Sequence, residues 1–139
     1  MHPKTARMLL MGQHDAIRAS LAECVGIAKR LRAGDGLETE LEDALERMRA
    51  ELYQHNLCET SLLRPLLMRT HRWGEVLLER MIEEHVAEHV AMWTVMNQPA
   101  MRIAHQLDDL AEELDAHMTA EERTFLAVLR PDVLEHHQR

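Results

Sequence analysis

Two short runs of this sequence repeat one arrangement of a histidine and a carboxylate, the first from His55 to Glu59 and the second from His117 to Glu121. Residues four apart lie on the same face of a helix, so each run directs an imidazole nitrogen and a carboxylate oxygen to one side. Nitrogen and oxygen donors of this kind suit iron, manganese or zinc. The repeat therefore indicates a metal site, and two such runs that face each other could hold two ions.

Three further histidines can complete such a site: His14 near the N-terminus, and His85 and His89, which are again four residues apart. If the first two helical segments are antiparallel, His14 precedes their loop by about as many residues as His55 follows it, so the two lie at one height. The same count, made on either side of the loop between the third and fourth segments, leaves His85 roughly 9 Å from the level of His117 along the bundle. His89 lies one turn further away. His85 is thus the nearer candidate, although the spacing lets both face one ion.

Glu59 and Glu121 fall on helix stripes that otherwise consist mainly of Leu, Met and Ile. An ionised carboxylate in an apolar core costs several kcal/mol unless it is paired, and no Lys or Arg shares these faces nearby. A metal cation would supply the missing charge. One His-x-x-x-Glu pair alone would be weak evidence, because polar pairs at this spacing are common on exposed helix faces. The combination of both pairs with the other histidines favours metal binding.

Three short interruptions divide the chain into four long helical segments, and they contain Gly34 with Gly36, then Gly74, then Pro99. Residues that favour helices, chiefly Leu, Ala, Glu, Met and Arg, dominate between them. Because short loops make successive helices antiparallel, the sequence predicts an all-α, up-down-up-down four-helix bundle with a dinuclear metal site in its core. The whole chain, 1–139, is expected to be one domain, with helices over about 3–33, 37–68, 75–97 and 100–129.

Composition and charge argue against several kinds of partner. The chain has 24 acidic and 16 basic residues, a formal net charge of -8, and its basic residues are scattered. Nucleic acid and anionic membranes are therefore not expected to bind. The start of the sequence has no apolar segment of the signal-peptide type, and no stretch reaches the roughly 18 apolar residues that a membrane span needs. We expect a cytoplasmic protein.

Taken in order along the chain, the candidate residues resemble the hemerythrin-like family, also called the HHE cation-binding domain. The likeness covers nearly the whole chain and rests on His14, His55-x-x-x-Glu59, His85-x-x-x-His89 and His117-x-x-x-Glu121-Glu122. It implies a four-helix bundle around two non-haem iron ions that share carboxylate bridges and an oxo or hydroxo bridge. By this resemblance, one iron takes His14 and His55, the second takes His85, His89 and His117, and the bridging carboxylates are Glu59 and Glu121.

Two features of the resemblance leave alternatives open. Oxygen-carrying hemerythrins space the last histidine and its bridging carboxylate by five residues, which would select Glu122, whereas broader HHE domains space them by four, which selects Glu121. Symmetry with the run from His55 to Glu59 favours Glu121. The broader group also often uses only one histidine of the third helix, so His85 and His89 need not both bind metal.

The resemblance implies a protein that binds or reacts with a small oxidant, namely oxygen, peroxide or nitric oxide. Reversible binding of that ligand and enzymatic consumption of peroxide or nitric oxide both fit the residues. A third alternative is an iron-binding regulatory or storage protein, since metal binding also stabilises a fold. The donor set exceeds the four ligands of a closed structural zinc site, but the choice of iron depends on the family resemblance.

Overall fold

The computed structural model describes residues 2–70 and 73–129, without the side chains of residues 70, 84–89, 91, 92, 95 and 128. This part of the chain is all-helical and contains no strand, as predicted. Its elements are α1 (Pro3–Arg32), α2 (Glu38–Thr70), α3 (Gly74–Met96), α4 (Ala100–Ala104), α5 (Leu107–Arg123) and the short 3-10 helix η1 (Ala127–Leu129). None of the described helices is both long and apolar enough to cross a membrane.

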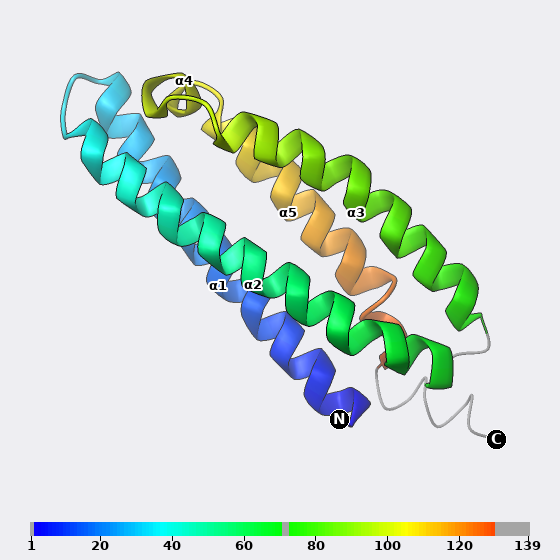
Figure 1. Cartoon of the computed structure of the whole chain (residues 1–139). Coiled ribbons are helices and arrows are strands. Elements are labelled where there is room, and N and C mark those ends of the chain that lie inside the picture. The colour runs from blue at the N-terminus through cyan, green and yellow to red at the C-terminus, as the bar shows by residue number, and fades with distance from the viewer. Residues whose placement is uncertain (1, 71–72, 130–139) are drawn as a thin grey trace.

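The four long helices run alongside one another, and each runs opposite to the long helix before it (Figure 1). The short α4 lies at the same end as the turn between α1 and α2. This arrangement is compatible with the predicted four-helix bundle. It places α1 and α2 as one antiparallel pair, with α5 against α1 and α3 against α2.

The first helix illustrates how local sequence sets the ends of these elements. Pro3 occupies a first-turn position, where its missing N–H is not needed, and His2 Nδ1 accepts a hydrogen bond from the Lys4 amide at 3.1 Å. After the helix, Gly34 and Gly36 have φ angles of 81° and 97°. Only glycine adopts this left-handed region without strain, so the turn into α2 forms where the sequence predicts it.

Two apolar clusters fill the core, one on each side of a layer of buried polar residues. Along α1, His14 separates Leu10 of one cluster from Ile17 of the other. In the same way, Glu121 on α5 lies between Met118 and Phe125, which belong to different clusters. The buried polar layer consists of His14, His55, Glu59 and Glu121. These four predicted site residues are therefore enclosed by apolar side chains above and below.

The expected helix over 100–129 is divided into α4, α5 and η1. The division follows Ala104, whose carbonyl accepts a hydrogen bond from the Arg32 guanidinium. The next amides, of His105 and Gln106, turn back to carbonyls three residues earlier, so the regular helical hydrogen bonding stops there. A second helix then begins, with Asp108 and its neighbour Asp109 in its first turn, where negative charge is favourable.

The turn between α2 and α3 depends on Gly74. A β-carbon at this position would clash with the backbone carbonyl of Leu67 on α2. The start of α3 can therefore approach the end of α2 this closely only with glycine. Pro65 lies inside α2, which continues through it to Thr70.

Candidate metal centre

Three helices bring His14, His55 and Glu121 together in the bundle core. The Nε2 atoms of His14 and His55 lie 3.1 Å apart, as expected for residues at one height. Glu121 Oε2 lies 3.5 Å from Nε2 of His14 and 3.9 Å from Nε2 of His55. All three side chains are buried, and each offers one donor atom within 4.8 Å of the others. This group could hold a metal ion.

Glu59 and His117 adjoin the group from its two flanks. Glu59 Oε2 lies 3.0 Å from His55 Nε2, one helical turn along α2, and its side chain is fully buried. On the other flank, His117 Nε2 contacts Oε1 of Glu121. The two oxygens of Glu121 therefore face different histidines: Oε2 faces His14 and His55, and Oε1 faces His117.

The outer nitrogens of two histidines are held by hydrogen bonds. His14 Nδ1 donates to Glu122 Oε2 at 2.8 Å, and His55 Nδ1 donates to the amide oxygen of Gln13, also at 2.8 Å. These partners orient both rings so that Nε2 points to the centre. Partners of this kind fix the orientation and tautomer of metal-binding histidines. The arrangement suits two imidazoles that share one ion.

Arg18 fixes the carboxylate that holds His14. Its guanidinium donates to both oxygens of Glu122, at 2.9 and 3.1 Å, and to Asp115 at 2.8 Å. Burial alone would raise the pKa of Glu122, but the hydrogen bonds from Arg18 and His14 outweigh it and lower the pKa. Glu122 is therefore a carboxylate anion at neutral pH, and it belongs to the support of His14.

The electrostatics of the centre depend on its carboxylates. Burial alone would lower the pKa of His55, but hydrogen bonds with Glu121 and Glu59, and the charge of both, raise it to about 9. Burial likewise would raise the pKa of Glu121, yet its hydrogen bonds with Glu59 and the nearby histidines hold that pKa well below its usual range. Without metal, a protonated His55 thus balances part of the buried negative charge.

The separations between donor atoms can be compared with those around a real ion. Two ligands that each lie ~2.1 Å from one ion are ~3.0 Å apart at right angles and ~3.4 Å apart in a tetrahedron. The separations within the group are 3.1, 3.5 and 3.9 Å. Small side-chain movements would therefore bring these nitrogen and oxygen atoms into one coordination shell. The residues present fit a metal.

Five of the seven predicted metal ligands lie together in the structure: His14, His55, Glu59, His117 and Glu121. The other two, His85 and His89, lie on α3, but their side chains are outside the described part of the chain. Of the two alternative carboxylates, Glu121 faces the centre, whereas Glu122 holds the outer nitrogen of His14.

Sequence reasoning missed two residues that support the centre, Gln13 and Arg18. A signal for Arg18 was present, because it follows His14 by four residues and so lies one turn along the same helix face. Gln13 had no such signal, because its contact with His55 depends on how α1 and α2 pack together. Gln13 is next to His14 on α1, and neighbouring positions on a helix point in directions about 100° apart. The position of His14 therefore does not indicate what Gln13 contacts.

Comparison with protein-family models, with curated proteins and with solved structures finds no match to this chain. The resemblance to the hemerythrin-like family therefore remains a prediction from the motif residues themselves.

Proposed function

We propose that this chain is a non-haem di-iron protein that binds or reacts with a small oxidant, namely oxygen, peroxide or nitric oxide. The observation that carries this proposal is the position of Glu121, whose two oxygens face histidines from different parts of the bundle. A carboxylate placed in this way is suited to bridge two ions. A closed site for one ion would not require histidines that face both oxygens of Glu121.

The residues divide into two groups around that carboxylate. His14 and His55 would hold one ion, and their Nδ1 hydrogen bonds already direct both Nε2 atoms inward. His117 would hold the second ion together with residues of the third helix, for which the motif supplies His85 and His89. Glu59 lies beside His55 and would be the second bridging carboxylate.

Bound iron would supply the redox chemistry, because two adjacent ions can together exchange two electrons with a small oxidant. The chain's own contribution is a dry and fixed environment. Ile17 and Met118 lie in the apolar cluster on one side of the donors, and Leu63 and Phe125 lie in the cluster on the other. Exclusion of water and protons by such residues controls the reactivity of a metal centre.

Metal stoichiometry and the response to oxygen test this proposal. The metal-free protein is titrated with ferrous iron under anaerobic conditions, and oxygen is then added while the absorption spectrum is recorded. We expect two iron ions per chain and a spectral change on addition of oxygen. A change that reverses under vacuum indicates reversible binding, and irreversible change with repeated consumption of oxidant indicates an enzyme. Uptake of one ion or none would contradict the proposal.

A further inference from the structure

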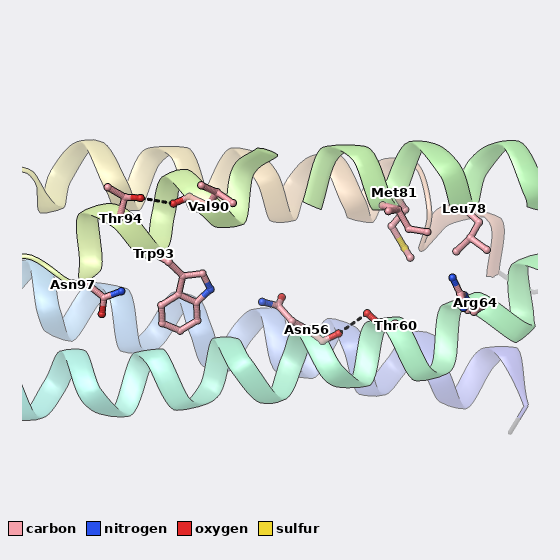
Figure 2. A pocket seen from close by; sticks show the side chains of 10 residues that line it. Asn56, Thr60, Arg64, Leu78, Met81, Val90, Trp93, Thr94 and Asn97 are labelled. Atoms are coloured by element: carbon pink, nitrogen blue, oxygen red, sulfur yellow. Dashed lines mark hydrogen bonds between the residues drawn. The ribbon is translucent and has the colours of Figure 1, made fainter. Parts of the chain in front are cut away.

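A groove lies between α2 and α3, and none of its described lining residues is a proposed metal ligand. It has a volume of about 740 Å³, within the range of small-molecule sites. Asn56, Thr60 and Arg64 line it from α2, and the α3 side includes Leu78, Met81 and Trp93. Figure 2 shows the Trp93 indole reaching toward α2, with Asn56 near it and Arg64 further along α2. We call this feature the α2–α3 groove.

Much of the wall of the α2–α3 groove is apolar. Met81 is buried, and Trp93 is half-buried. Ile82 and Val90 also line the groove, although 41% and 64% of their surfaces are exposed. Exposed apolar residues gathered around a concavity favour a ligand with an apolar body, because its binding removes their surface from water.

Two of the polar residues of the groove have unused hydrogen-bond donors. The hydroxyl groups of Thr60 and Thr94 already donate to carbonyls of their own helices, at 3.0 and 2.8 Å. The Arg64 guanidinium, by contrast, makes no ion pair or hydrogen bond within the described part of the chain, and neither does the Trp93 indole N–H. Among the described lining residues, Arg64 is the one charged group. A ligand for these donors carries acceptor oxygens and negative charge.

The charge of the whole chain limits that ligand further. The formal net charge is -8, so a polyanion would be repelled from most of the surface. One unpaired guanidinium matches one carboxylate. The distance along α2 from Asn56 to Arg64 is ~12 Å, which suits an extended molecule.

We propose that the α2–α3 groove binds an elongated organic monocarboxylate, with its apolar body against the Ile82, Val90 and Trp93 side and its carboxylate at Arg64. This binding site goes beyond the proposed metal chemistry and does not require a bound ion. The ligand class follows from the unpaired Arg64 guanidinium, the unpaired Trp93 N–H and the apolar residues of the wall.

Fluorescence of Trp93 provides the test. Trp73→Phe leaves Trp93 as the sole tryptophan of the full chain, and decanoate, kept below its micelle concentration, is the probe. We expect a saturable change in Trp93 emission. Arg64→Gln should raise the decanoate dissociation constant ~3- to 5-fold, because Arg64 is exposed and an ion pair at an exposed site is weak. Arg64→Lys, which keeps the charge, should retain most of the affinity.

Two controls make the test specific. Arg69→Gln removes a cation from the same helix whose guanidinium donates to the Pro65 carbonyl and which does not line the groove, so it should leave decanoate binding unchanged. Decanol, which lacks the carboxylate, should bind more weakly than decanoate and should not respond to Arg64→Gln. The proposal is overturned if Trp93 gives no saturable response, if decanol and decanoate bind equally, or if the Arg64 and Arg69 variants lose affinity equally. It is also overturned if sedimentation shows a dimer that covers the groove and excludes decanoate.

Discussion

The side of the molecule where α1 meets α2 and α5 differs from the side where α2 meets α3. On the first side, ion pairs cross between helices, including Arg47 with Glu23 at 2.8 Å and Arg18 with Asp115 at 2.8 Å. On the second side lies a groove of about 740 Å³ with exposed apolar residues. The first side, which we call the ion-paired side, carries the oriented donors His14 and His55, and its own groove of about 560 Å³ is lined mainly by charged residues. The surface of the groove on the second side is mainly apolar. Oriented metal donors and an apolar groove are thus provided by different helix pairs.

The largest expected effect concerns the carboxylate between the two proposed ions. Glu121→Gln keeps the size of the side chain but removes its charge, so we expect uptake of both ions to be lost. His14→Ala, on the ion-paired side, should mainly weaken the binding of one ion. Metal analysis after dialysis against ferrous iron measures both variants. Retention of two ions by Glu121→Gln, or equal small losses in both variants, would contradict a bridging role.

The next effect compares packing on the two sides. Ile17 is buried on α1, and its replacement by Ala should lower the free energy of unfolding by ~2–5 kcal/mol, because a cavity remains. Ile82 lines the groove and is 41% exposed, so Ile82→Ala should change it by less than ~1 kcal/mol. Urea denaturation of the metal-free proteins measures both. Equal losses would mean that the two sides are packed alike.

A smaller effect is expected from the residues that hold the donors in place. Arg18→Gln removes the clamp on Glu122 and should weaken metal binding by ~10–100-fold without abolishing it. Competition with a metal chelator measures this affinity. The matched control, Arg102→Gln, changes an exposed arginine on α4 and should leave the affinity at the wild-type value. If both variants bind metal equally well, Arg18 does not support the centre.

The smallest effect concerns the surface ion pairs of the ion-paired side. Arg47 and Glu23 are both more than half exposed, so Arg47→Ala should cost less than ~1 kcal/mol of unfolding free energy. The difference from wild type should shrink further at high salt, because salt screens exposed charges. A loss of several kcal/mol in urea denaturation would show that these pairs, rather than the apolar clusters, hold α1 to α2.

The sequence predicted the helices well because their signals are local. Gly34 and Gly36 mark one turn, and the apolar stripes that include Leu10 and Ile17 mark buried faces. The common height of His14 and His55 followed from counting residues on either side of that turn. Predictions of this kind need only the rise of a helix and the length of a loop.

The division of the fourth helical segment could not be predicted in this way. It coincides with a hydrogen bond from Arg32, on α1, to the carbonyl of Ala104. The support of His55 by Gln13 likewise depends on the packing of two helices. Contacts between residues distant in the sequence leave no periodic signal, so they emerge only when the helices are placed in space.

Anomalous diffraction at the iron absorption edge, from crystals loaded anaerobically with ferrous iron, tests the central claim most directly. The account predicts two iron peaks on opposite sides of the Glu121 carboxylate, one beside His14 and His55 and the other beside His117. One peak, or peaks away from these residues, would contradict it.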